Sequence, residues 1–151
     1  MRNRTLILSV ILTLSFWNNV AQSARGQALV PYTPPLDSEQ LKQTGFGLLE
    51  EAAQLTRFQQ YQLALPRAEL ATQLAPDSYQ AWALLGSLYL QLDELDKGIE
   101  SLQKAKTLEP KDPGIQFILG EAYFKKGDYQ KSVQFLEAAL KIDPKVSGGV
   151  I

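Results

Sequence analysis

Carboxylates are the side chains of this chain that could do acid–base chemistry, because its 151 residues include 16 Asp and Glu but no His and no Cys. Such a chain has no thiol nucleophile, no imidazole base and no zinc site of the usual Cys and His kind. Paired carboxylates can hydrolyse glycosides, but no spacing among the acids selects a pair. We therefore expect no catalytic residue, no cofactor and no enzymatic activity.

Charged groups point to neither a metal nor a nucleic acid. The acidic cluster Asp93, Glu94 and Asp96 has no calcium-loop spacing, and acidic residues at a helix N-terminus are ordinary solvated groups. The 15 Lys and Arg leave a formal net charge of −1, so the chain lacks the basic excess that drives nucleic-acid binding. We expect no metal and no nucleic acid as a partner, which leaves binding of another protein.

The N-terminus has the three parts of a secretory signal peptide. Two arginines precede the apolar run 6–17, and small residues follow it. Cleavage after Ser23, Gly26 or Ala28 would each satisfy the small-residue rule, and we favour a signal peptide over residues 1–28. We therefore expect an exported protein of the periplasm or the extracellular space. The alternative is an uncleaved segment, which would make the membrane a partner.

Residues 29–37 form the predicted linker, because three prolines within five positions favour extended backbone. Asp37 and Gln40 have the spacing of a helix N-cap pair. From there the chain has helical patterns and no strand pattern. We therefore predict an all-α domain over residues 38–146.

A period of 34 residues organises this domain. The equivalent positions are Pro76, Pro110 and Pro144, then Ala71, Ala105 and Ala139, and then Leu85–Gly86 with Leu119–Gly120. The period predicts three helical hairpins, over residues 45–78, 79–112 and 113–146, with helices of about 14 residues. Small residues are expected where the helices cross, namely Gly86, Gly98, Gly120 and Ser132. Pro66 is expected in a first turn, in a helix that starts near Leu65.

These positions resemble the tetratricopeptide repeat (TPR), whose first-helix pattern Trp-x-x-Leu-Gly-x-x-Tyr is matched in full by residues 82–89. The third repeat has Gln116 in place of the Trp, and the first repeat is a degenerate copy. The resemblance implies an α-solenoid of three TPR units with about six antiparallel helices. It also places five aromatic residues in the core rather than in a ligand cage: Tyr79, Trp82, Tyr89, Tyr123 and Tyr129.

The resemblance implies that the first helices line a concave groove, in which the protein binds a peptide or protein segment as a scaffold or assembly factor. The implied groove positions are Leu49, Glu50, Ala53, Ala83, Leu84, Ser87, Leu90, Phe117, Ile118, Glu121, Phe124 and Lys125. TPR domains that grip a chaperone's C-terminal carboxylate use Lys, Arg and Asn here. The mostly apolar set of this chain favours an apolar or amphipathic segment. Alternatively, Phe117, Ile118 and Phe124 pack between repeats.

The helix predicted at residues 129–142 carries Phe135, Leu140 and Ile142, which we expect on a face that a further repeat would cover. Residues 147–151 are then the truncated start of such a repeat, or a tail. The alternatives are self-association or partner docking through this face, or a truncated or adaptor portion of a larger exported repeat protein or enzyme. The chain also resembles exported TPR proteins of photosynthetic bacteria, some of whose relatives help to assemble photosystems, which implies the thylakoid lumen as another compartment.

Overall fold

The computed structural model describes residues 37–146. The predicted signal peptide over residues 1–28, the linker up to Leu36 and the last residues, 147–151, lie outside the described residues. The described residues form helices and no strands, which confirms the all-α prediction. The helices are α2 (Ser38–Arg57), α3 (Tyr61–Leu74), α4 (Tyr79–Gln91), α5 (Leu95–Leu108), α6 (Pro113–Lys126) and α7 (Tyr129–Ile142).

Helix α2 begins with the predicted cap. The Asp37 carboxylate accepts a hydrogen bond from the Gln40 backbone N–H at 2.7 Å, and the Gln40 side chain accepts one from the Asp37 N–H at 3.2 Å. This reciprocal pair satisfies two backbone donors that a helix start otherwise leaves free. Helix α2 is 20 residues long, because it starts ahead of the first predicted repeat at residue 45.

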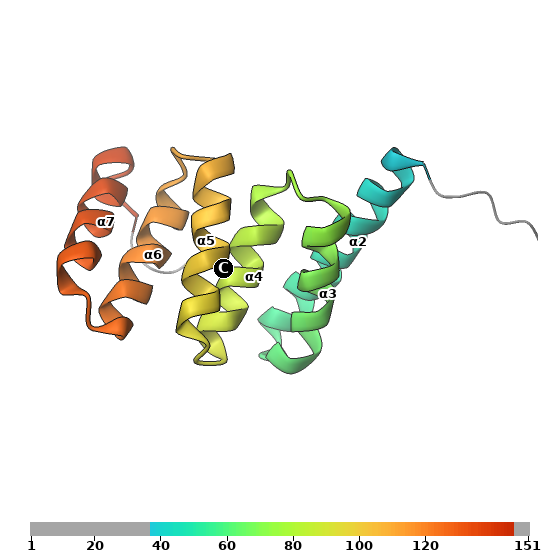
Figure 1. Ribbon diagram of the computed structural model, residues 1–151, viewed down its shortest axis with the longest axis horizontal. Helices are drawn as coiled ribbons and strands as arrows, with labels where there is room; N and C mark the ends of the chain where they lie inside the picture. Colours follow the sequence, from blue (N-terminus) through green and yellow to red (C-terminus); the bar gives the residue numbers. More distant parts are fainter. Residues whose placement is uncertain (1–36, 147–151) are drawn as a thin grey trace, which may run out of the picture. The chain divides into compact units, whose positions relative to one another are not determined.

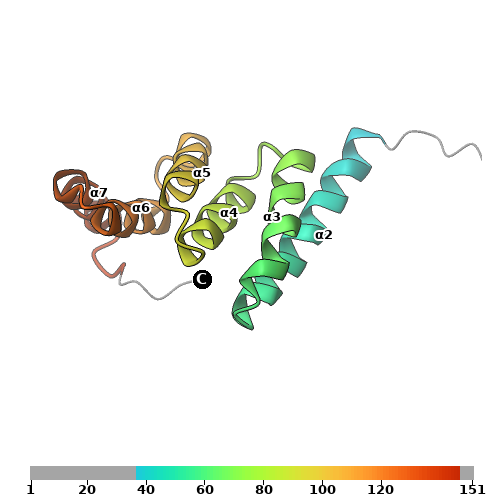
Figure 2. The ribbon, with the colours of Figure 1, turned by 60° about the horizontal axis from the view of Figure 1, so that its bottom comes forward.

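The six helices stand side by side in chain order (Figure 1). They form three hairpins, α2–α3, α4–α5 and α6–α7, which follow one another in a second view (Figure 2). The most extensive contacts join the two helices of each hairpin, while contacts of α3 with α4 and of α5 with α6 join neighbouring hairpins. Weaker contacts join α2 to α4 and α4 to α6. This is the arrangement of an α-solenoid.

The turn inside each hairpin has one residue in the left-handed region. These residues are Gln59, Asp93 and Gly127, with φ values of 58°, 63° and 84°, and they are 34 residues apart. Glycine adopts this conformation without steric cost, whereas the other two residues tolerate it as single turn residues. The predicted period therefore holds for the backbone conformation of the turns.

Small residues lie where the helices of a hairpin cross, as predicted. A Cβ atom on Gly86 of α4 would stand 2.6 Å from Leu102 Cγ and 3.0 Å from the Gly98 carbonyl oxygen of α5. In the third hairpin, a Cβ atom on Gly120 would stand 2.7 Å from Leu136 Cγ. Only a residue without a side chain allows the backbones to approach this closely.

A side-chain hydrogen bond holds the start of α4 and of α6 to the turn before it. Trp82 donates its indole N–H to the Pro76 carbonyl at 2.9 Å, and Gln116 donates its side-chain amide to the Pro110 carbonyl at 3.1 Å. Gln116 therefore makes the same bond as the tryptophan that it replaces. This equivalence explains how the third repeat keeps its geometry without the aromatic residue.

Two sequence predictions about single residues are wrong. Pro66 does not lie in a first turn, because α3 begins at Tyr61 and contains it. Proline has no N–H to donate to the Gln62 carbonyl four residues earlier. Both residues are exposed, so water can bind this carbonyl instead. Tyr129 is not a core residue: it is 63% exposed and packs edge to face with Phe124. The described residues place nothing over this side of α7.

Candidate functional site

A cavity of about 360 Å³ lies between the first helices of the three hairpins, α2, α4 and α6. Its walls are mainly aliphatic side chains, with a few polar groups at the starts of α4 and α6. The lining residues are Leu49, Ala53, Tyr79, Gln80, Ala83, Leu84, Asp112, Gly114, Ile115 and Ile118. A mostly apolar concavity with a few polar groups is typical of a ligand site.

Small residues in the lining leave space for the cavity. Ala53, Ala83 and Gly114 contribute little volume, whereas Leu84 and Ile115 are the large buried residues of the lining and are here termed its floor. Leu84 and Ile115 are 5% and 3% exposed and belong to the core. Because core packing holds them, the floor of the cavity is preformed.

The carboxylate of Asp112, at the start of α6, is held in the lining by a backbone contact. Of the ten described residues that line the cavity, Asp112 alone is charged. Its carboxylate accepts a hydrogen bond from the Ile115 backbone N–H at 2.9 Å and caps α6, which begins with Pro113. This bond uses one acceptor site of the carboxylate and fixes where it lies, so its remaining lone pairs are available to a guest.

The structure places five of the predicted groove residues in this lining: Leu49, Ala53, Ala83, Leu84 and Ile118. Ser87 and Phe117 are half-buried outside it, and the Ser87 hydroxyl donates to the Ala83 carbonyl at 3.0 Å. The other predicted positions outside the lining are exposed, namely Glu50 on α2 and Glu121, Phe124 and Lys125 on α6. All these residues lie on the helices that line the cavity, but only some of them reach it.

The predicted groove residue Leu90 lies in the core instead. It is 7% exposed and belongs to the cluster formed with Ile99 and Leu102 of α5. A Cβ atom on Gly98 would stand 2.6 Å from Leu90 Cδ2, so the missing side chain of Gly98 makes room for the leucine. The prediction for Leu90 was wrong because the burial of this residue depends on a glycine in another helix.

Of the residues predicted for an association face on α7, Leu140 and Ile142 are exposed, whereas Phe135 is half-buried. The Phe135 ring stacks on Tyr123 with centroids 5.3 Å apart and planes 3° apart. The Lys106 ammonium covers it from 4.9 Å. Phe135 therefore faces α5 and α6, while Tyr129 and Val133, which the sequence prediction did not name, are also exposed on α7.

Sequence reasoning also missed the lining residues at the helix starts: Tyr79, Gln80, Asp112, Gly114 and Ile115. They precede the predicted groove positions of α4 and α6 by one turn. A signal was present, because both helices begin with a capping residue that fixes which residues form the first turn: Ser78 for α4 and Asp112 for α6.

Neither a metal site nor a membrane span is present among residues 37–146. This part of the chain has no group of three or more acidic residues placed to hold an ion. None of its helices is both long and apolar enough to cross a bilayer. In the acidic cluster of Asp93, Glu94 and Asp96, Glu94 pairs with Lys97 at 2.5 Å and Asp96 pairs with Lys126.

Family models fit the two C-terminal repeats. A tetratricopeptide repeat model matches residues 113–146, and a second TPR repeat model matches residues 86–127. The chain is a tetratricopeptide repeat protein. This TPR protein has no match among curated protein sequences.

Solved structures share the fold of this TPR protein. MamA from Desulfovibrio magneticus RS-1 is 27% identical with a TM-score of 0.60, over 74% of this chain and 78% of that chain. The chaperone SycD of the Yersinia enterocolitica type III secretion translocator is 18% identical with a TM-score of 0.64, over 75% and 83%. The first TPR of Spaghetti (RPAP3), solved with a bound HSP90 peptide, is 16% identical with a TM-score of 0.67, over 69% and 82%.

Taken with the family match, these neighbours support a protein–protein interaction module. The TPR is typically a non-enzymatic interaction module, in keeping with a sequence that offers no nucleophile and base pair.

Proposed function

We propose that this TPR protein is a scaffold or assembly factor, and that it binds a segment of another protein in the cavity between α2, α4 and α6. The observation that carries the proposal is the apolar lining contributed by all three first helices. A guest that fills it with one apolar side chain contacts each repeat at once. Burial of that side chain supplies the affinity, and the rim supplies the specificity.

The lining favours an apolar anchor over a terminal carboxylate. It has no Lys, Arg or Asn, and its one charged group is the carboxylate of Asp112. An anionic chain end placed there would be repelled and would find no strong donor. The HSP90 peptide in the Spaghetti TPR structure shows that a related fold accommodates a peptide, and it is that protein's ligand.

A photo-crosslinking experiment tests the groove. The full chain would carry a photoreactive amino acid at Gln80, which lines the cavity, and in a second preparation at Gln73, which is exposed on α3. We expect crosslinks to a defined protein segment from position 80 alone. The substitution Ala83→Trp, which fills the cavity, should abolish them, whereas Gln134→Trp on the exposed surface of α7 should not. The same crosslinked proteins from positions 80 and 73, or no effect of Ala83→Trp, would refute the proposal.

We also propose that the protein acts after export, in the periplasm or outside the cell, or in the thylakoid lumen of a photosynthetic organism. The support is the charge and apolar pattern of residues 1–28. N-terminal sequencing of the protein recovered from its cells tests this proposal. A start at Leu29 is expected, and a start at Met1 in a soluble cytoplasmic fraction would refute it.

A second candidate function is that of an adaptor portion within a larger exported repeat protein or enzyme. The exposed apolar residues of α7, which include Val133 and Leu140, favour it because a further repeat would cover them. An immunoblot of native cells separates the two candidates. A band near 16.8 kDa, or the slightly lower mass of the processed chain, supports the scaffold on its own, and a much larger band supports the adaptor.

A further inference from the structure

We propose that the guest segment carries a lysine or arginine beside its apolar anchor, because the rim of the cavity is acidic. This inference rests on the proposed function and adds the chemistry of the partner. Three carboxylates carry it: Asp112 in the lining, and Glu50 and Glu121 on the two outer helices of the groove.

The repeat period places Glu50 and Glu121 in groove-lining rows. Glu50 of α2 is equivalent to Leu84 of α4 and Ile118 of α6, both of which line the cavity. Glu121 of α6 is equivalent to Ala53 of α2, which also lines it. Both carboxylates are exposed. They therefore stand at the rim, where an apolar residue would extend the walls of the cavity.

These carboxylates have no cationic partner within residues 37–146. The six ion pairs of this part of the chain use other acids, such as Glu51 with Arg67 and Glu100 with Lys104. Glu50 accepts one hydrogen bond, at 3.3 Å, from the uncharged side chain of Gln54. The negative charge of the rim is therefore available to a guest.

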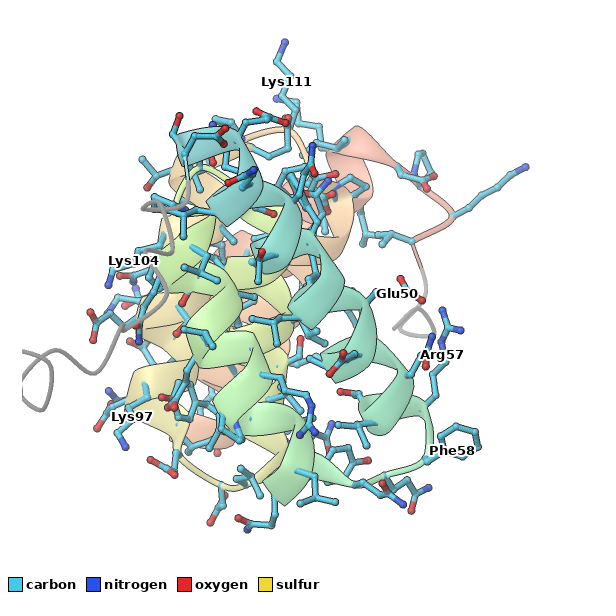
Figure 3. All side chains as sticks on the ribbon, turned by 90° about the vertical axis from the view of Figure 1, so that its right-hand side faces the viewer. Glu50, Arg57, Phe58, Lys97, Lys104 and Lys111 are labelled. Atoms are coloured by element: carbon cyan, nitrogen blue, oxygen red, sulfur yellow. The ribbon has the colours of Figure 1, made fainter. Side chains whose placement is uncertain are left out.

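Two cations, Arg57 of α2 and Lys125 of α6, lie farther along the helices than the two rim glutamates. The row Arg57, Gln91 and Lys125 follows the row of Ala53 and Glu121 by four residues, which is about one helical turn. Lys97 and Lys104 of α5 lie on the opposite side from Glu50 and Arg57 (Figure 3). Arg57 and Lys125 therefore stand toward the C-terminal ends of α2 and α6, while Lys111 directly precedes Asp112 in the chain, so the unpaired negative charge of the rim rests mainly on Glu50 and Glu121.

Complementary charge at a rim sets specificity and association rate more than total affinity. An exposed ion pair contributes little on its own, so two or three pairs should change affinity by about fivefold. The effect should shrink with added salt, because exposed charges are screened beyond about 10 Å at 0.1 M ionic strength.

Three synthetic peptides test the inference against the full chain. They differ only in the residues on either side of a central leucine, which are lysine, serine or glutamate. Fluorescence anisotropy should give the lowest Kd for the lysine peptide, about fivefold below that of the serine peptide, and the highest for the glutamate peptide. The difference should disappear in the double variant Glu50→Gln with Glu121→Gln.

The matched control is Glu39→Gln with Glu137→Gln, which removes the same charge from exposed positions of α2 and α7 outside the lining. It should leave the ranking of the three peptides unchanged. If all three peptides bind equally and Ala83→Trp abolishes this binding, the charge preference is overturned but the proposed groove is supported. Binding that ignores Ala83→Trp, or no binding of any peptide, would overturn both.

Discussion

The Tyr89 hydroxyl of α4 donates a 2.6 Å hydrogen bond to the Glu69 carboxylate of α3 and so ties the second hairpin to the first. The equivalent bond one repeat later runs from the Gln103 side-chain amide to the Tyr123 hydroxyl at 2.9 Å. Both tyrosines stand in the same position of the repeat. The hydrogen bonds between hairpins therefore follow the 34-residue period as well as the backbone does.

The Tyr89 bond predicts a pH dependence of stability. Burial, followed by the hydrogen bond to Glu69, raises the pKa of Tyr89 from 10.0 to about 12. The folded chain therefore holds this proton more tightly than the unfolded chain does. The contribution is complete below pH 10 and is lost as the pH rises to about 12. The ultraviolet absorbance of tyrosinate, as the difference between wild type and Tyr89→Phe, should show this late titration. A midpoint near 10 would contradict it.

A pair of glycine substitutions tests the helix crossings. Gly86→Ala should lower the free energy of unfolding by about 1–3 kcal/mol, because the new Cβ atom overlaps Leu102 and meets a backbone oxygen. Gly47→Ala has open space around it and should raise the same free energy by about 0.5–1 kcal/mol through helix propensity. Urea unfolding followed by circular dichroism measures both. Equal effects of the two substitutions would show that the crossing is not tight.

Replacement of Pro66 should stabilise the protein. Proline inside a helix is about 3 kcal/mol less favourable than alanine. Part of the gain in stability is lost, because alanine gives the unfolded chain more conformational entropy than proline does. We expect Pro66→Ala to raise the free energy of unfolding by about 2 kcal/mol. Pro113 at the first turn of α6 is the control, because no backbone hydrogen bond is lost there. Pro113→Ala should gain nothing, and an equal gain at both sites would contradict this account.

The exposed face of α7 predicts self-association. Val133 is 53% exposed, whereas its equivalent Ile99 on α5 is 7% exposed under α6. Together with Tyr129 and Leu140 it forms an apolar surface of the kind that marks an interface. We expect the mass of the full chain in sedimentation equilibrium to rise with concentration above that of a monomer. The double variant Val133→Glu with Leu140→Glu should remain monomeric.

The control for this variant is Gln134→Glu, which adds a charge to the same helix at an exposed position. It should associate like the wild type. Phe135→Glu is unsuitable, because that ring is covered by Lys106 and its replacement would damage the core. A wild-type chain that stays monomeric at every concentration would refute the prediction.

The fold was predictable because its determinants recur at one spacing. The bounds of α7 match the predicted residues 129–142, since the same Ala and Pro positions end the earlier hairpins. The candidate site was predictable only in part. Leu90 is buried because it packs against Gly98, and Phe135 is half-buried because Lys106 covers its ring. Each of these partners lies on another helix. A sequence period shows which positions are equivalent, but it does not show which neighbouring side chain fills or covers them.

The contacts between the first helices have a mechanical consequence. Helix α4 touches both α2 and α6, while α2 and α6 make no comparable contact with each other in the described part of the chain. The two outer walls of the cavity are therefore linked only in series. A small rotation at either junction would change the gap between Leu49 and Ile118, so the stiffness of two joints sets how bulky an anchor can enter.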